Sequence, residues 1–502
     1  MKTVIFFYSE AMKESCWLRK DIIFFDERGW RLLVGKSRNA IIPRNFILNN
    51  CNYQSYNSAS IIKKLKDWSP IWSRWCGKGD QHELLLREGL FLVIEIAEGL
   101  KKLKIQNCIM HTGIPHHVDS VIFHLACEQV NVRIIYLYSE IFSGRLIPLE
   151  MNGLVTDRKL FGKIISRYSY KKILTEFLER NKKGLPPKNN FIPSNNKSFL
   201  HALGLIIKSS FRNLVKLSIQ SILKIFFNIL NYKKAENIFI RFNNSYFLQN
   251  INQIFQQREA LTFLDRNIIN QAYLEKNVLK KNRPLLLFAA HYQPEATSFP
   301  EGWDFANHID IILKLRELGY KKIILYKEHW GSYCYSINHY AGTTKSKKNN
   351  QMSLVAISRS KEYFEQLKKL GCIFMPINFS ISISNPLADN FLPITISGTI
   401  AIERSLNGLH TIVAGNPWWK GLPGTIPLSE IKSLSVLKSE WITPNPTLAK
   451  KSFNFLEKCL NNKTIINVGG IGTNLNLNGA KDKVLWKNEI ESLLKKINKR
   501  GS

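Results

Sequence analysis

One pattern recurs between residues 283 and 415: short apolar runs alternate with amphipathic helical stretches that end on a glycine. Apolar runs of this length are typical of buried strands, and i, i+3, i+4 spacing is typical of helices. The apolar runs lie at 283–291, 321–326, 372–377, 391–396 and 410–415. The helical stretches lie at 304–319, 360–371 and 400–408. This alternation predicts a parallel sheet with helices wound on both faces.

The N-terminal part of the chain shows the same alternation over residues 1–175. Its first residues, MKTVIFFYSE, predict a strand, and helical spacing alternates with β-rich runs further on. A chain of 502 residues has room for two or three domains. We predict an N-terminal Rossmann-like, acceptor-side domain at 1–179, a linker and basic helical insertion at 180–280, a C-terminal Rossmann-like domain at 281–480 and a terminal helix at 481–502.

The charge balance of the chain favours anionic partners. Lys and Arg number 71 and Asp and Glu 38, so the formal net charge is +33. Nucleic acid, an anionic membrane surface and phosphorylated substrates all fit such a charge. We expect no nucleic-acid partner, because the aromatic residues do not interleave with basic ones as they do in known binding modules.

Residues 197–235 carry seven basic residues and no acid, with apolar residues at near-helical spacing between them. Two interpretations remain open for this segment. It is either a basic amphipathic helix that lies on anionic lipid, or a helix packed on the protein with its lysines in solvent. The second is favoured, because most amphipathic helices face a core.

The predicted localisation is cytoplasmic, with contact to the inner face of the membrane through residues 197–235. The eight cysteines include no CxxC pair and lie mostly in apolar stretches, which fits a reducing compartment. The first apolar run is too short for the core of a signal peptide. No uninterrupted apolar run approaches the ~18 residues of a membrane-spanning helix.

Two polar segments directly follow predicted strands of the C-terminal domain, where open α/β sheets bind their ligands. His291, Gln293 and Glu295 follow the first strand in HYQPE, and Lys327 and His329 follow the second in KEHW. The first segment suits a sugar or acid–base chemistry, and the second suits a phosphate. The alternatives are a turn that satisfies its own backbone and a solvated strand end.

A third segment, Ser397-Gly398-Thr399, joins a predicted strand to a predicted helix. Amides at a helix N-terminus and two hydroxyls can hold an anion, and Glu403, one turn further on, can bond a ribose diol. The alternative is an ordinary N-cap followed by an ordinary helical glutamate. The loop GNPWWKGLPG at 415–424, after the next strand, favours the functional interpretation.

The sequence predicts neither a metal nor a bound cofactor. It contains no GxxxxGK[ST], HExxH or DxD pattern, and GGIG at 469–472 is followed by TNLNLNG rather than by a helical pattern. His116, His117 and His124 have no acid or cysteine at a convincing ligand spacing.

The three C-terminal segments together carry a resemblance to a known family. In order they read AAHYQPEATSFPEGWDFANHIDIILKL, YKEHW and ISGTIAIERSLNGLHTIVAGNPWWKGLPG. This set resembles the bacterial capsule polysaccharide biosynthesis family, which includes the transferases that add Kdo during capsule assembly. The N-terminal half is similar more loosely, through Gly113-Ile-Pro115-His116, Ser139-Glu140 and Ser143-Gly144-Arg145.

The resemblance implies a GT-B fold, in which two Rossmann-like doubly wound domains face a cleft and the C-terminal one binds the nucleotide donor. It implies that His329, Ser397, Gly398 and Thr399 hold the donor phosphate. It further implies that Gln293 and Glu295 line the sugar end and that Glu403 meets the nucleotide. The chain departs from the family at Trp330, where a proline is usual, and the lost proline is expected to relax the turn that presents His329.

The predicted function is therefore a metal-independent glycosyltransferase of capsule or surface polysaccharide assembly. It moves a sugar from a nucleotide-sugar to a growing polysaccharide or lipid-linked acceptor. Glu295, His291 and His116 are the catalytic candidates, and Lys327 joins the donor-binding residues. Two alternatives remain: a nucleotide-sugar epimerase on the same fold, and a degenerate scaffold of the assembly machinery, which Trp330 and the basic segment motivate.

Overall fold

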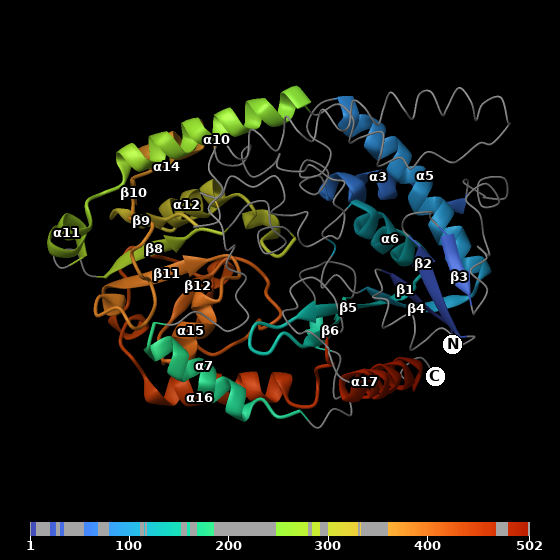
Figure 1. Cartoon of the computed structure of the whole chain (residues 1–502). Helices are drawn as coiled ribbons and strands as arrows, with labels where there is room; N and C mark the ends of the chain where they lie inside the picture. Colours follow the sequence, from blue (N-terminus) through green and yellow to red (C-terminus); the bar gives the residue numbers. More distant parts are fainter. Residues whose placement is uncertain are drawn as a thin grey trace.

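The computed structural model confirms the predicted α/β class. The residues that it describes are 2–6, 21–26, 31–34, 55–68, 80–110, 115, 118–151, 158–160, 168–184, 247–279, 284–291, 300–329, 332, 360–467 and 480–499. They form two sheets, each flanked by helices, and Figure 1 shows the N-terminal sheet on the right and the C-terminal sheet on the left.

The N-terminal sheet has the strand order β3-β2-β1-β4-β5-β6-β7. Its strands are β1 Lys2–Phe6, β2 Ile22–Asp26, β3 Arg31–Val34, β4 Ile105–Met110, β5 Arg133–Ser139, β6 Leu146–Met151 and β7 Arg158–Leu160. Strands β2, β1, β4 and β5 are parallel, whereas β3, β6 and β7 pair antiparallel at the edges. The parallel centre is the predicted Rossmann-like part.

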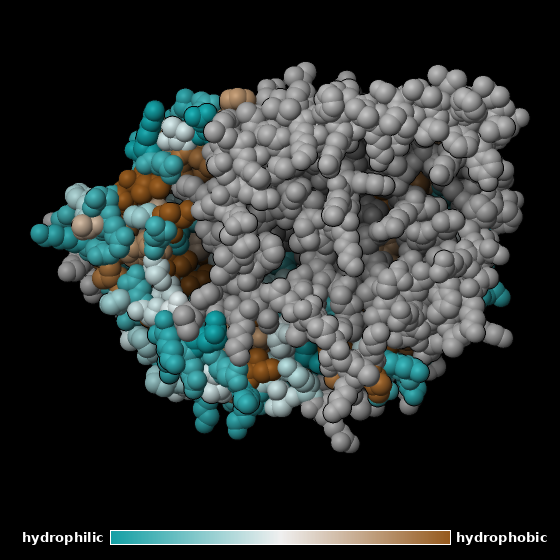
Figure 2. Space-filling view, in the orientation of Figure 1, coloured by the Kyte–Doolittle hydropathy of each residue, from teal (hydrophilic) through white to brown (hydrophobic). Residues whose placement is uncertain are grey.

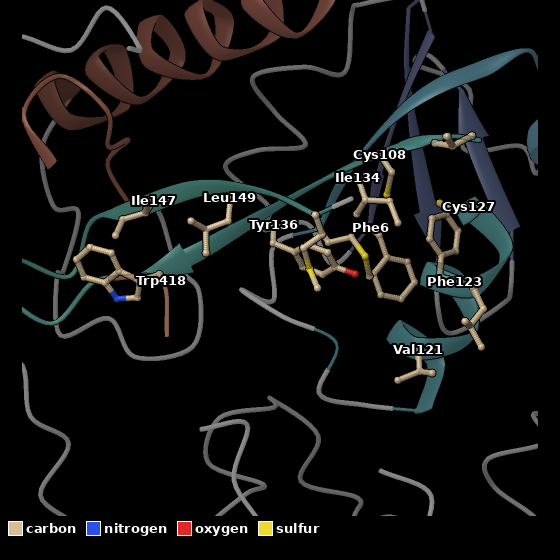
Figure 3. Packing of buried hydrophobic residues seen from close by; sticks show 14 of the residues in the cluster. Phe6, Cys108, Val121, Phe123, Cys127, Ile134, Tyr136, Ile147, Leu149 and Trp418 are labelled. Atoms are coloured by element: carbon tan, nitrogen blue, oxygen red, sulfur yellow. The ribbon is translucent and has the colours of Figure 1, made fainter. Parts of the chain in front are cut away.

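Side chains of this sheet alternate between two cores, because successive strand residues face opposite sides. In β1, Val4 and Phe6 pack with α5 (Asp80–Lys102) and α6 (Val118–Gln129), and Tyr136 of β5 joins the same core (Figure 3). Ile5 packs instead with Trp486 of α17 (Ala480–Lys499). The C-terminal helix, predicted as a separate segment, therefore covers the second face of the N-terminal sheet.

The C-terminal sheet is entirely parallel, in the order β10-β9-β8-β11-β12-β13. Its strands are β8 Leu285–Ala289, β9 Ile324–Lys327, β10 Cys372–Phe374, β11 Phe391–Thr395, β12 Thr411–Val413 and β13 Thr425–Pro427. One face packs against three helices, which are α10 Phe247–Asn267, α12 His308–Glu317 and α14 Lys361–Lys369. The other face packs against residues that include Leu274 and Val278 of the helical turn Leu274–Leu279.

The predicted glycine stops are confirmed by backbone geometry. Gly319, Gly371 and Gly408 have φ values of +88°, +82° and +75°. A side chain disfavours this left-handed conformation, so glycine is the usual residue just after a helix. The start of the predicted 304–319 helix is different: α12 begins at His308, where the side chain of Asn307 accepts the N–H of Ile309, and residues 303–305 form a 3-10 turn.

The two units share one hydrophobic core. Helix α7 (Lys171–Lys182) packs against α15 (Ile400–Leu406) and α16 (Pro446–Leu460). Trp418, from the loop after β12, belongs to the same core as Ile147 and Leu149 of β6. Figure 3 shows Trp418 at the end of the cluster where Ile147 and Leu149 lie.

The segment 180–280, predicted as a linker with a basic insertion, is partly helical where the structure describes it. Helix α7 continues to Lys182, and α10 packs on α14 of the C-terminal unit through residues that include Ala260 and Leu264. Residues 197–235 lie outside the described residues, so both interpretations of that segment stay predictions.

Helices α7 and α16 each present one polar face to solvent. Lys171 and Lys172 of α7 and Lys450 and Lys451 of α16 are exposed, and Figure 2 shows mainly hydrophilic side chains along the lower edge where these helices lie. Within the described part of the chain, no helix has both the length and the apolar character that crossing a bilayer requires.

Candidate functional site

The predicted site segments of the C-terminal unit all follow strands of one parallel sheet. The carboxyl ends of β9, β8 and β11 therefore lie at the same edge, in that order. Neighbouring strands are ~4.8 Å apart, so the ends of β9 and β11 lie about 10 Å from each other. This edge is where open α/β sheets bind ligands.

His291, just beyond β8, is bonded directly to the turn that follows β11. Its Nε2 lies 2.8 Å from Thr395 Oγ1 and accepts the backbone N–H of Ser397 at 3.2 Å. Thr395 Oγ1 in turn accepts the N–H of Gly398 at 3.1 Å. These bonds join two segments more than 100 residues apart, and His291, Thr395 and Ser397 are all buried. We call His291, Thr395, Ser397 and Gly398 together the His291 bracket.

The donor directions in the His291 bracket fix the state of the imidazole. An amide N–H can only donate, so Nε2 of His291 is the unprotonated nitrogen, and the proton of the neutral ring is on Nδ1. The Thr395 hydroxyl then donates its proton to Nε2, and its oxygen accepts the N–H of Gly398. An acid–base role for His291, which the sequence predicts, would have to use Nδ1.

Gly398 is required by the close packing of the bracket. A Cβ at this position would lie 2.5 Å from Thr395 Oγ1 and 3.4 Å from His291 Nε2. Contacts under 3.0 Å are not tolerated by real Cβ atoms. Any larger residue would therefore push the turn away from His291.

The alternative interpretation of this turn, an ordinary N-cap, is met by Thr399 in position but not through its side chain. Helix α15 begins at Ile400, and Thr399 at its N-cap makes no side-chain capping bond. The Thr399 hydroxyl instead donates to Glu403 Oε1 at 3.3 Å, and the amides of Ser397 and Gly398 are used by the His291 bracket. Burial raises the pKa of Glu403, and the bond from Thr399 acts against this.

The short helix α15 is held in place by Arg404, which is fully buried. Its guanidinium donates to the carbonyls of His410, Ala388 and Phe391 at 3.0, 3.1 and 3.4 Å. Burial lowers the pKa of Arg404 to about 10, although Asp389 raises it. These bonds tie the helix to the beginnings of β11 and β12.

Lys327, the last residue of β9, is a partly buried cation at this edge. Its Nζ donates to the carbonyl of Ile377 at 2.6 Å, just beyond β10. Burial lowers the pKa of Lys327 to about 8, against an opposing effect of Glu328. The folded protein therefore holds this charge at a cost, which is common where a cation has a ligand to bind.

The cost of the Lys327 charge predicts a gain in stability when it is removed. The folded-state pKa of about 8 is below the ordinary 10.5, so the unfolded chain binds more protons between these values and wild-type stability rises with pH across them. We expect Lys327→Met to raise the free energy of unfolding by about 1–2 kcal/mol at pH 7, and the gain to vanish near pH 10.5. Urea unfolding at several pH values measures this, and a variant less stable than wild type at pH 7 would contradict it.

His329 follows β9, and both its backbone N–H and its backbone carbonyl are hydrogen-bonded within the protein. Its N–H donates to Glu328 Oε1 at 2.7 Å, and its carbonyl accepts the N–H of Ser332 at 2.9 Å. These two bonds hold the backbone of His329, and the relaxation expected from Trp330 stays a prediction.

Two further backbone segments meet the turn after β11. The N–H of Gly415 donates to the carbonyl of Ile396 at 2.9 Å, and the N–H of Asn416 donates to the carbonyl of Glu301 at 2.9 Å. A Cβ at Gly415 would lie 2.7 Å from Ile396 Cγ2, so glycine permits this approach. The loops after β8, β11 and β12 thus converge at one edge of the sheet.

Gln293, Glu295, Trp330 and His116 lie outside the described residues, so their predicted roles stay predictions. Among the described residues, no group of three or more metal-ligating side chains comes together.

The N-terminal motif residues Glu140 and Arg145 form a buried network away from the C-terminal sheet. Glu140 accepts the N–H groups of Ser143 and Arg145 and the hydroxyl of Tyr170, each at 3.0 Å. Burial raises the pKa of Glu140, and the hydrogen bonds from Ser143 and from the Arg145 N–H act against this. Arg145 donates to Glu489 of α17 at 2.7 Å. Arg145 thereby joins the N-terminal sheet to the C-terminal helix, and Glu140 holds the turn that carries Arg145.

Thr395 and Glu328 are site residues that the sequence analysis did not single out. Thr395 is a hydroxyl residue at the end of an otherwise apolar strand, and Glu328 stands between two residues that were selected. For Thr395 the available signal was a polar residue at the last position of a buried strand, and for Glu328 it was a carboxylate directly after one.

No protein-family model matches this chain, and no curated protein sequence matches it. Among solved structures, a match is the crystal structure of Methanocaldococcus jannaschii UDP-GlcNAc 2-epimerase in complex with UDP-GlcNAc and UDP. The identity is 14%, the match covers 99% of each chain, and the TM-score is 0.19. A TM-score of this size carries no weight, so the fold rests on the strand order and pairing of the two sheets.

Proposed function

We propose that this chain is a GT-B glycosyltransferase of capsule or surface polysaccharide assembly. It would transfer a sugar from a nucleotide-sugar to a growing polysaccharide or lipid-linked acceptor. The observation that carries the proposal is the His291 bracket, because it joins two of the three motif segments at the ligand-binding edge of a parallel sheet.

The polar groups at this edge of the sheet suit a nucleotide phosphate, which gains negative charge as it departs from the sugar. Lys327 and His329 follow β9, and the turn Ser397–Thr399 follows β11 on the other side of β8. A diphosphate between them would meet the positive charge of Lys327 and the backbone hydrogen-bond donors of the turn before α15. Fixed donors of this kind stabilise charge that develops in the transition state.

A thermal-shift screen with CMP, UDP, GDP and dTDP tests the proposal. A nucleotide at ~100 times its dissociation constant is expected to add ~2.7 kcal/mol to the apparent stability. Binding should weaken as the pH rises through about 8, because Lys327 then loses its charge. If none of the four nucleotides shifts the unfolding transition, the proposal is wrong.

Two glycine variants locate the bound nucleotide. Gly398→Ala should remove most of the shift, because its methyl group would clash with Thr395 in the His291 bracket. Gly89→Ala is the matched control, since its Cβ would meet only Leu65 atoms at an ordinary 3.5 Å. An equal nucleotide shift in both variants would place the ligand elsewhere.

Product analysis then separates the reaction classes. A transferase consumes the donor only with an acceptor, whereas an epimerase converts the donor alone. A scaffold binds without turnover of either.

A further inference from the structure

Glu328 is a buried carboxylate that the proposed chemistry does not itself use. Its side chain is 5% exposed, and it receives three hydrogen bonds. The His329 N–H and the Ser332 hydroxyl donate to Oε1 at 2.7 and 2.9 Å, and the Tyr326 hydroxyl donates to Oε2 at 2.9 Å. Two of these donors belong to the turn that carries His329.

A line of buried polar groups lies behind Glu328. The Tyr326 hydroxyl is 3.0 Å from that of Tyr363 on α14, which is 3.0 Å from Nδ1 of His308 on α12. With Glu328 as a carboxylate, each direction follows: Tyr326 donates to Glu328, Tyr363 to Tyr326, and His308 to Tyr363. The helices that cover one face of the sheet thus orient the carboxylate.

The turn is also held from α10. Gln257, 4% exposed, donates from Nε2 to the carbonyl of Ser332 at 2.9 Å. The N–H of Ser332 closes the turn on the carbonyl of His329. In loops at a sheet edge, backbone N–H and C=O groups are normally hydrogen-bonded to water. Here the backbone groups of His329 and Ser332 have protein partners instead, which indicates that this turn is held in one position.

We propose that Glu328 is a positioning residue that fixes His329 for contact with the phosphate of a nucleotide. This inference rests on the proposed function for the identity of the ligand, but the fixing of His329 can be measured without one. Glu328 stands directly before His329 and bonds its amide, so loss of the carboxylate frees the backbone that presents the imidazole.

Amide hydrogen exchange of the whole chain tests the fixing. Glu328→Gln should speed exchange at His329 by about tenfold or more, because the amide loses its charged acceptor. Glu140→Gln is the matched control: it removes another buried carboxylate that accepts backbone amides and a tyrosine hydroxyl, but in the N-terminal unit. It should leave exchange at His329 unchanged. If Glu328→Gln fails to fold, Ser332→Ala, which removes one donor to Glu328, replaces it.

Nucleotide affinity tests the consequence, by calorimetry with the nucleotide that the screen identifies. Glu328→Gln should weaken binding by about tenfold, and Glu140→Gln should not. The same change should have no further effect in a His329→Ala background, because its action passes through His329. The matching nucleoside, which lacks phosphate, should bind wild type and Glu328→Gln equally.

The outcomes separate the two ideas. Unchanged exchange at His329 overturns the positioning role, whether or not a nucleotide binds. Faster exchange with no nucleotide bound by wild type supports the fixing of His329 and rejects the proposed function. Equal losses from Glu328→Gln in the wild-type and His329→Ala backgrounds make Glu328 a purely structural residue.

Discussion

Replacement of Glu489 by alanine is expected to lower the free energy of unfolding by about 3–5 kcal/mol. Arg145 and Glu489 form an ion pair at 2.7 Å in which both side chains are 4% exposed. Glu489 also accepts the N–H of Ile466 at 2.6 Å. The alanine leaves the buried guanidinium without its counter-charge, and among the described residues only the hydroxyl and carbonyl of Thr464 then accept its hydrogen bonds. Urea denaturation followed by circular dichroism measures the loss.

Two controls show whether the loss comes from an unpaired buried charge. The double variant Arg145→Met/Glu489→Leu should recover most of the stability, because apolar residues of similar volume can replace a buried pair. It should stay about 1 kcal/mol below wild type, since the Ile466 amide loses its acceptor. Glu317→Ala, which breaks an exposed pair with Lys314, should cost less than about 0.5 kcal/mol. Equal losses from Glu489→Ala and Glu317→Ala would show that α17 is not anchored by this pair.

Glu295→Gln is expected to reduce sugar transfer by about 100-fold or more while nucleotide binding survives. Glutamine keeps the size and hydrogen bonding of the side chain but cannot take up the acceptor proton. Comparison of kcat with the nucleotide dissociation constant separates the two effects. Glu317→Gln, at an exposed carboxylate of α12, serves as the control and should leave both values unchanged.

Near-normal turnover in the Glu295→Gln variant would remove Glu295 from the catalytic candidates. His116, which follows β4 of the N-terminal unit in the sequence, would then be the residue to replace.

The sequence predicted the parts of the fold that depend on neighbouring residues. Strand β8 and helix α14 lie inside their predicted ranges because apolar spacing records which face of an element is buried. Gly371, which ends α14, adopts the left-handed backbone for which glycine is selected. Each of these features depends on only a few consecutive residues.

The antiparallel strand β6, which lies between β5 and β7, and helix α16 were missed. Residues of both belong to the core that the two units share, so their burial depends on the neighbouring unit. The same limit applies to α17. Its amphipathic spacing predicted a helix, but the sheet that it covers begins almost 480 residues earlier in the chain, at β1.

The candidate site divides in the same way. Its three segments could be found from the sequence, because polar residues directly after apolar strands are a local signal. Only the tertiary structure decided that His291 bonds the turn after β11, that Thr395 completes the bracket and that Gln257 of α10 bonds Ser332 after β9. These bonds join atoms whose distance depends on how strands pair and helices pack, and no periodicity of a single chain segment records that distance.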